Sequence, residues 1–395
     1  MKIFRKFISA AAALLIFTAA APAYSYAEPS ASPVSLLSES ISSSSVNGDN
    51  FFSSVSEAGV YFRSQLKARN TSITITLPKS SDSLTVTVNK IMNEALAETG
   101  VPSEGDYLRM AISSYHCQSL TSNTRLKLNF TLNYHTTAEQ EKAVDVKVAQ
   151  IMNTLDIKGK SDYDKIKAVY GYITSNIVYA ENMENSDIFS SYGAVVNNEA
   201  VCQGFAQLLY RMLGEAGIRS RIISGTSNNI GHAWNLADVD GKCYLMDITW
   251  DSAFSGKSYF YFLKGSDDFD SFTNKQTHTT GSGDPDNYAI FPNYTSAEFS
   301  AEYPISKTAY NSEAYKLGDI DNDGKITAAD ASEALSAYAR ASSIADTGLT
   351  SLERKAADVN SDGRVDAIDA ALILKYYAFS SGGQNVDFSE FIKSR

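Results

Sequence analysis

The C-terminal part of the chain contains the same acidic pattern twice. The stretches "DIDNDGKITAAD", beginning at Asp319, and "DVNSDGRVDAID", beginning at Asp358, place oxygen-bearing side chains at positions one, three, five, nine and twelve and glycine at position six. This is the spacing of a calcium loop, in which the glycine permits a sharp turn and the carbonyl of position seven completes the ligand shell. The predicted ligands of two Ca2+ ions are Asp319, Asp321, Asp323, the carbonyl of Lys325, Thr327, Asp330, Asp358, Asn360, Asp362, the carbonyl of Arg364, Asp366 and Asp369.

These loops constrain how the tail can fold, because clustered carboxylates repel one another until a cation binds, so that metal binding and folding are coupled. Position twelve is aspartate, whereas an EF-hand usually has glutamate there. Two tandem loops with aspartate at position twelve, each expected to be followed by a helix, resemble a type I dockerin. The resemblance implies an extracellular module that binds the cohesin domain of a scaffoldin, as in a cellulosome. The implied cohesin contacts are Ala328, Ala329, Ala367, Ile368 and Lys375.

The N-terminus has the pattern of an export signal. Basic residues precede an apolar run that begins at Phe7, and small residues follow at 25–27. Such a segment is a secretory signal peptide that is removed from the mature protein, which we expect to be secreted and without a membrane span. The net charge of −11 and the lack of a broad basic face argue against a nucleic-acid partner.

The segment after a Ser-rich linker mixes strand and helix patterns. The alternating stretches "TSITITLP" and "TRLKLNFTLNYH" predict strands. The stretch "SLTVTVNKIMNEALAETG" begins like a strand and ends like a helix. Thr137 opens a capping-box pattern ahead of a helical repeat. We therefore expect a small N-terminal α/β module.

Helices followed by strands come next, and this order predicts an α+β fold. The stretches "SDYDKIKAVYGYITSNIVYA" and "VCQGFAQLLYRMLGEAG" have apolar residues at helical spacing. The stretches "RSRIISG", "HAWNLADVD", "KCYLMDITWD" and "SYFYFL" predict successive strands.

Cys202 stands where the second of these helices begins. A helix N-terminus stabilises a thiolate, which is the nucleophilic form of cysteine, but a nucleophile also needs a base and a group that orients the base. A two-residue turn at 240–241 pairs Val239 with Lys242. It thereby places Asp247 diagonal to His232 on one face of the hairpin, within side-chain reach.

Together, "CQGFA" on a helix, "HAWN" on a strand and "DITWD" after the next strand resemble the transglutaminase-like (transglutaminase/protease-like) core domain. The resemblance implies a papain-like α+β fold and a Cys-His-Asp triad formed by Cys202, His232 and Asp247, which needs no cofactor. It also suggests oxyanion or substrate contacts at Tyr192, Gln203 and Trp234, and a protein or peptide substrate.

The remaining cysteines and histidines fit no second site. Cys117 and Cys243 make an odd total with Cys202, which argues against a disulfide scaffold. Cys243 is expected to be a packed thiol, and His135 and His278 are expected to be surface or loop residues. No zinc-ligand spacing links these residues.

The function predicted from these features is a secreted cysteine acyl-transfer enzyme, with hydrolysis favoured over transamidation, docked through calcium-loaded dockerin to a cohesin scaffold. Two alternatives remain open: a non-catalytic scaffold component, and an accessory protein in polysaccharide degradation, although no acid pair is typical of a glycosidase. The predicted organisation is a signal peptide (1–27), a Ser-rich linker (28–58), the N-terminal α/β module (59–160), the catalytic domain (161–300), a linker (301–316), the dockerin (317–380) and a tail (381–395).

Overall fold

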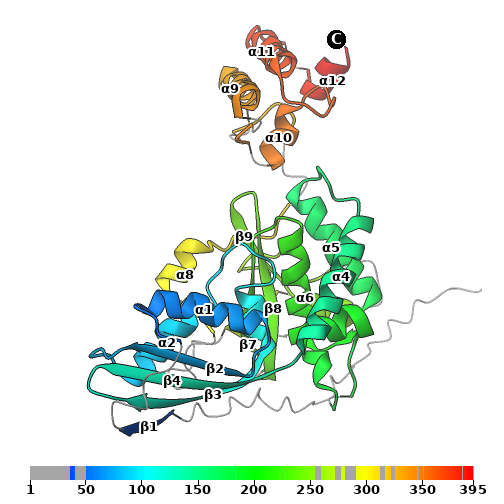
Figure 1. Ribbon diagram of the computed structural model, residues 1–395. Helices are drawn as coiled ribbons and strands as arrows, with labels where there is room; N and C mark the ends of the chain where they lie inside the picture. The colour runs from blue at the N-terminus through cyan, green and yellow to red at the C-terminus, as the bar shows by residue number, and fades with distance from the viewer. Residues whose placement is uncertain are drawn as a thin grey trace, which may run out of the picture.

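The computed structural model describes residues 36–40 (backbone only), 50–182, 184–228, 230–253, 259–271, 277–280, 291–311, 316–321, 325–344, 347–349, 351–384 and 386–394. The predicted signal peptide, most of the Ser-rich segment and the predicted ligand Asp323 lie outside the described residues. Figure 1 shows an N-terminal sheet with two helices, a central body of helices and a second sheet, and a group of C-terminal helices. None of the helices within the described ranges is both long enough and apolar enough to span a bilayer.

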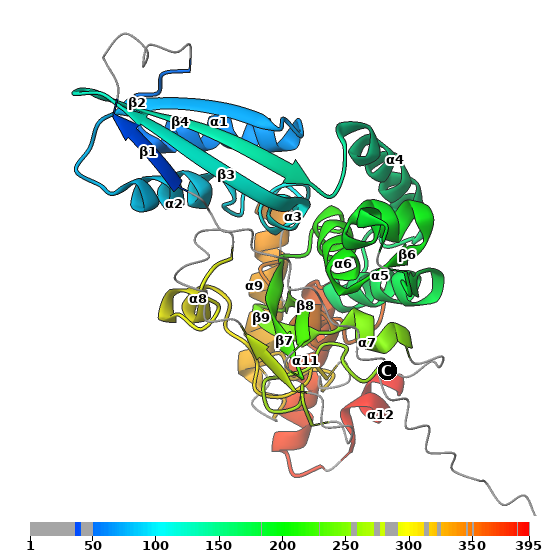
Figure 2. The same ribbon diagram turned by 90° about the horizontal axis from the view of Figure 1, so that it is seen from below.

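The N-terminal module is a four-stranded sheet with the order β1-β3-β4-β2 and two helices packed on one face (Figure 2). Alternation in β4 buries Leu128, Phe130 and Leu132 against these helices. The bounds are β1 Leu36–Ser40, α1 Val55–Lys67, β2 Ser72–Pro78, α2 Leu84–Ala95, α3 Asp106–Ala111, β3 Ile112–Thr121 and β4 Arg125–Tyr134. β1 and the start of α1 fall within the stretch that the sequence analysis treats as a linker.

The first part of the mixed pattern before Gly100 is helix α2, Leu84–Ala95, so the predicted initial strand is wrong. Ser83 caps α2 by accepting a hydrogen bond from the backbone N–H of Val86. Val88, Ile91 and Met92 then face the core at helical spacing. The β-branched residues that suggested a strand are therefore overridden by the cap and by packing against the sheet.

In the central body, α6 packs on a second sheet with the order β10-β7-β8-β9, and α4 and α5 pack against α6. Its large hydrophobic core lies between α6 and the sheet, with Phe205, Leu208 and Leu209 fully buried. The bounds are α4 Ala138–Thr154, α5 Asp162–Asn176, β5 Val178–Tyr179, η2 Ser186–Phe189, η3 Gly193–Asn197, β6 Glu199–Ala200, α6 Cys202–Glu215, β7 Ser220–Ser227, β8 Ile230–Val239, β9 Lys242–Met246, α7 Ile248–Ala253, β10 His278–Thr280 and α8 Ala297–Glu302.

The predicted hairpin between β8 and β9 is confirmed residue by residue. Val239 pairs with Lys242, and Asp240 and Gly241 form the turn with φ angles of 54° and 78°. Two positive φ angles in succession match the right-handed twist of the two strands. The predicted continuation of strand through "DITWD" is wrong, because β9 ends at Met246 and α7 begins at Ile248. The described part of "SYFYFL", residues 259–263, forms no named strand.

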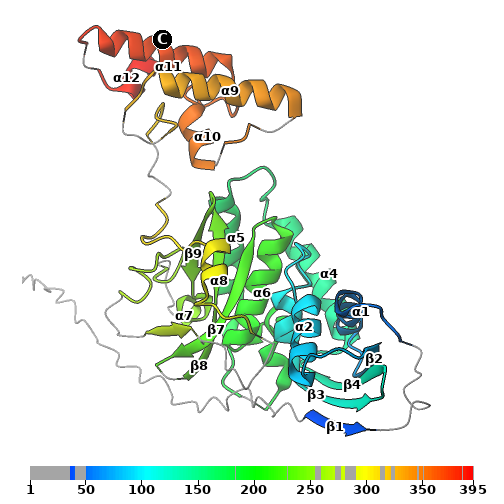
Figure 3. The same ribbon diagram turned by 90° about the vertical axis from the view of Figure 1, so that its left-hand side faces the viewer.

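The C-terminal part is helical, and a helix follows each of the two acidic loops, as the sequence predicts. Figure 3 shows α9 and α11 side by side. Phe388 and Phe391 of the short last helix pack against Tyr376 of α11 and complete a separate core. The bounds are α9 Ala328–Ile344, α10 Ser351–Ala357, α11 Ala367–Ser381 and α12 Phe388–Lys393.

A buried carboxylate joins the N-terminal module to the second sheet. Asp106 of α3 is fully buried and accepts two hydrogen bonds from Arg221 of β7, at 2.7 and 3.0 Å, one from Arg109 at 3.0 Å and one from the backbone N–H of Ile222 at 2.8 Å. Burial by itself would raise the pKa of Asp106, but the two guanidinium groups lower it below its usual value. The ionised carboxylate thus depends on partners from both parts of the chain.

We expect Arg221→Met to destabilise the protein by about 3–5 kcal/mol, because it leaves the buried Asp106 charge without its bidentate partner. Methionine retains apolar packing against Phe299 and Tyr303, over which the guanidinium lies. Arg219→Met is the matched control, since that side chain is 48% exposed and pairs with Asp238 at the surface; its cost is expected to stay below about 1 kcal/mol. Chemical unfolding measures both, and equal costs for the two variants would contradict the role given to Asp106.

Candidate active site

Cys202 is the first residue of α6 and is 2% exposed. Val201, the preceding cap residue, provides no side-chain hydrogen bond to the first N–H groups of the helix. Gly204 lets the 188–190 segment approach this end of α6, because a Cβ there would lie 2.7 Å from the carbonyl oxygen of Ile188 and 2.9 Å from that of Ser190. The thiol therefore lies at the positive end of a helix dipole, in a closely packed setting.

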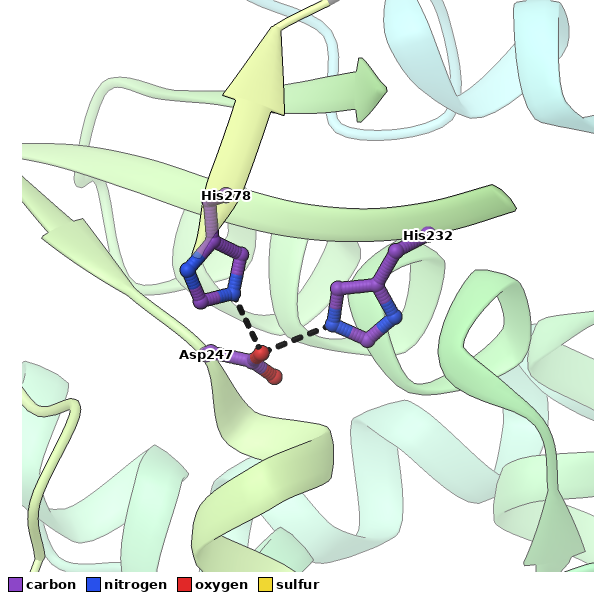
Figure 4. A group of neighbouring side chains, drawn as sticks. All are labelled: His232, Asp247 and His278. Carbon is purple, nitrogen blue, oxygen red and sulfur yellow. Dashed lines mark hydrogen bonds and ion pairs between the residues drawn. The ribbon is translucent and has the colours of Figure 1, made fainter. Parts of the chain in front are cut away.

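His232 of β8 faces both Cys202 and Asp247. Its Nε2 donates to Asp247 Oδ2 at 2.7 Å (Figure 4). Burial by itself would lower the pKa of His232, but the Asp247 carboxylate and then Cys202 raise it to about 10. The same pairing lowers the pKa of Asp247 to about 2 against the opposing effect of burial. This arrangement favours an imidazolium that is held between a carboxylate and a sulfur atom.

Asp247 lies between β9 and α7 and is fully buried. Its Oδ1 accepts from the backbone N–H of Trp250 at 3.1 Å, as the side chain of a helix-capping residue does. The indole Nε1 of Trp250 lies 2.9 Å from His232 Nε2. The carboxylate is the stronger partner of that nitrogen because its hydrogen bond is charge-assisted, so the His232 proton faces Asp247. Trp250 is a further residue of the site, and its position in the stretch "DITWD" does not by itself predict this contact.

His278 was expected to be a surface or loop residue, and this prediction is wrong. Its side chain is 3% exposed, and its Nε2 lies 2.9 Å from the same Oδ2 of Asp247 that His232 contacts (Figure 4). Its Nδ1 lies 2.7 Å from Asp270 Oδ1. The sequence offered no sign of this contact, since His278 reaches the site only through the pairing of β10 with β7.

Trp234 is 1% exposed, and its contact with substrate remains a prediction. Its ring lies beneath both histidines, with centroid distances of 6.0 Å to His232 and 4.9 Å to His278. The inward face of β8 directs it into the core with Tyr261 and Phe269. Trp234 therefore supports the imidazole rings from the core side.

Gln203 and Gln207 of α6 attach the site helix to the N-terminal module. Gln203 Nε2 donates to the carbonyl of Met110 at 2.9 Å, and Gln207 Nε2 donates to that of Tyr107 at 2.9 Å. The side-chain amide of Gln203 is thus directed at α3, and its oxyanion role remains a prediction. Tyr192 packs at the edge of the core at the start of η3, and its role likewise remains a prediction.

The other two thiols lie in apolar surroundings. All three cysteines are unpaired and buried. Burial raises the pKa of Cys117 to about 12. Burial also raises the pKa of Cys243, to about 11, with a smaller contribution from Asp238. Thiols of this kind stay protonated and unreactive at neutral pH.

The two acidic loops share one arrangement around position twelve. Asp330 and Asp369 are fully buried, and each accepts hydrogen bonds from backbone N–H groups at loop positions two, three and nine. Gly363, at position six of the second loop, has a φ of 85°. In the first loop, one oxygen each of Asp319, Asp321 and Asp330 lies within 4.8 Å of the others. Such an all-oxygen donor set fits a hard divalent cation.

A second group of possible metal ligands in the described residues is His232, Asp247 and His278. Their contacting atoms are separated by 2.7 and 2.9 Å. These are separations of atoms that hydrogen-bond one another. We therefore assign this group to hydrogen bonding.

Comparisons with known proteins agree with the two resemblances. Residues 149–250 match the model of the transglutaminase-like superfamily, and residues 317–377 match the model of the dockerin type I domain. The chain therefore contains a transglutaminase-like core domain and a C-terminal type I dockerin domain within an α+β architecture, and this recognition from the sequence is confirmed.

Two curated relatives and a solved structure each align with part of the chain. The kyphoscoliosis peptidases of Mus musculus and Homo sapiens are 26% and 25% identical to it over 118 residues, which cover 26% of this chain and 18% of each relative. A solved structure of a TGase aligns over 47% of this chain and 52% of its own length, with 16% identity and a TM-score of 0.27. The chain thus spans less than a fifth of its curated relatives.

We expect iodoacetamide at neutral pH to modify Cys202 in the folded protein and to leave Cys117 and Cys243 unmodified, because only Cys202 has a histidine partner and a helix N-terminus. Peptide mass spectrometry after a timed reaction measures each site. Cys202→Ser should lose the label and Cys243→Ser should retain it. Preferential labelling of Cys117 or Cys243 in the native chain would contradict the assignment.

Proposed function

We propose that the chain is a secreted cysteine acyl-transfer enzyme of the peptidase type, with a papain-like core, docked through its dockerin to a cohesin scaffold. The observation that carries the proposal is the placement of the His232 imidazole between Asp247 and Cys202, at the N-terminus of α6. All three residues lie within residues 149–250, which match the model of the transglutaminase-like superfamily.

In the proposed reaction, the Cys202 thiolate attacks the carbonyl carbon of an amide in a protein or peptide. The His232 imidazolium gives its proton to the nitrogen of the leaving amine as the C–N bond breaks, and a thioester remains on sulfur. Asp247 keeps the ring oriented and stabilises its charge throughout. N–H groups at the start of α6 are available for the negative charge that develops on the carbonyl oxygen.

The thioester is then released by an acceptor. Water, with His232 as general base, gives a carboxylic acid and regenerates the thiol, which is peptidase chemistry. A primary amine gives a new amide, which is transglutaminase chemistry. We favour water because the name of the curated relatives is that of a peptidase. Their similarity covers 26% of this chain and 18% of each relative.

The dockerin supplies the second half of the proposal. Asp330 and Asp369 anchor two loops whose remaining oxygen donors would hold two Ca2+ ions, and each bound ion would offset the repulsion of its carboxylates. The predicted cohesin contacts at Ala328, Ala329, Ala367, Ile368 and Lys375 are all exposed. Large apolar side chains are also exposed on the same two helices: Leu335, Tyr338, Leu374 and Tyr377. An exposed apolar surface of this kind favours a protein partner, and a cohesin partner implies an extracellular location.

Cys202→Ala is expected to lower the rate of peptide hydrolysis by on the order of 10^3-fold or more, because no other group in the proposed mechanism can form the thioester. Cleavage of a peptide library and incorporation of a fluorescent amine, measured in parallel, separate the two acceptors. Cys243→Ala serves as the matched control and should retain activity, since that thiol is buried in β9. Undiminished activity in Cys202→Ala would end the cysteine mechanism, and a wild-type protein inactive in both assays would favour a scaffold.

Calcium titration of the full chain is expected to show two sites, one of which is lost in Asp330→Asn and the other in Asp369→Asn. At a free Ca2+ concentration of 100 times Kd, each site should stabilise the dockerin by about 2.7 kcal/mol, so a chelator should lower its unfolding temperature. Isothermal calorimetry and circular dichroism measure the two effects. Asp156→Asn, an exposed change elsewhere, should leave both unchanged, and an unaltered site count in the two loop variants would contradict the ligand assignment.

A further inference from the structure

We propose that His278 and Asp270 are positioning residues of the cysteine site, forming with Asp247 a charged chain behind His232. This inference rests on the proposed function and deepens it. His278 Nε2 lies 2.9 Å from Asp247 Oδ2, its Nδ1 lies 2.7 Å from Asp270 Oδ1, and its backbone N–H donates to Asp270 Oδ2 at 3.0 Å. The sequence of contacts is therefore Cys202, His232, Asp247, His278 and Asp270.

His278 joins two carboxylates. Its Nδ1 lies 2.7 Å from Asp270 Oδ1, and its Nε2 lies 2.9 Å from Asp247 Oδ2. An ionised carboxylate only accepts hydrogen bonds, so the imidazole ring is a suitable partner for it. Asp247 is thus flanked by two imidazole donors that share one of its oxygen atoms (Figure 4).

The fold holds His278 closely in this place. β10 pairs with β7, which puts His278 opposite Ser227 and Thr280 opposite Gly225. Gly225 permits the approach, because a Cβ there would meet the carbonyl oxygen of Thr279 at 2.1 Å. The His278 ring lies 4.3 Å from that of Phe269 and 4.9 Å from that of Trp234, measured between centroids.

His278 changes what the Asp247 carboxylate does for His232. With His278 present, Asp247 Oδ2 is shared between two imidazole rings, which moderates the basicity of His232. The shared Oδ2 is also held from a second direction, while Trp250 holds Oδ1. Removing His278 would leave Asp247 Oδ2 to His232.

The experiment is the pH dependence of Cys202 alkylation and of turnover in the full chain. The titratable groups that face His278 are Asp247, Asp270, His232 and Tyr261. Tyr261 stays neutral over the range because burial raises its pKa to about 12. In His278→Gln we expect the limb set by His232 to move to higher pH by about 1 unit, because the Asp247 carboxylate is then no longer shared with a second imidazole and stabilises the charged form of His232 more strongly.

Asp270→Asn is the second variant. It tests the same chain of contacts in case His278→Gln does not fold. Its amide oxygen can still accept from Nδ1 but carries no charge, so the contact that holds His278 against Asp247 is weakened and the His232 limb should move in the same direction by a smaller amount. His116→Gln, on β3 of the N-terminal module, is the control and should leave the profile unchanged.

The outcomes separate the two proposals. Suppose that the wild type is reactive and that the pH profiles of His278→Gln and Asp270→Asn are not shifted, even if their rates are lower. This result would overturn the present inference alone, since a purely structural role lowers the maximal rate without shifting the pH profile. A wild-type Cys202 that resists alkylation at all pH values would overturn the proposed function and this inference together. Stoichiometric binding of Zn2+ that is lost in His278→Gln would also overturn it, because the group would then be a metal site.

Discussion

The structure depends on the burial of aspartate side chains whose charge is satisfied by groups from distant segments. Asp247 is the central case. It ends β9, caps α7 through the backbone of Trp250 and accepts from two histidines of different strands. An ionised carboxylate in the protein interior is costly unless hydrogen bonds replace its water. The segments that carry these donors are therefore held in place around it, and the geometry of the candidate site follows.

The same principle recurs at the other junctions of the molecule. Asp106 joins α3 to β7 through Arg221. Asp251 of α7 accepts from the hydroxyl of Tyr170 on α5 at 2.7 Å and from the backbone N–H groups of Phe260 and Tyr261. Burial raises the pKa of Asp251 to about 6. In the dockerin, Asp330 closes its loop by the same kind of backbone contacts.

The N-terminal module is part of the environment of the site helix. Gln203 follows the candidate nucleophile directly and donates to Met110, while Gln207, one turn later, donates to Tyr107. The helix α6 thus contacts both α3 and the second sheet. This double support places the first turn of α6 in a defined position, which a preorganised catalytic group requires.

The sequence alone determined the elements that depend on residues close together in the chain. These include the helix start at Cys202, the turn at 240–241 that sets the register of β8 and β9, and the two acidic loops with their helices, since spacing, turn chemistry and glycine positions act over a few residues. Only the tertiary structure decided that "SLTVT" is helical, that Trp234 is buried and that His278 reaches Asp247. Each of these depends on which distant strand or helix lies alongside, and the free energy of that packing exceeds the local preferences of the residues involved.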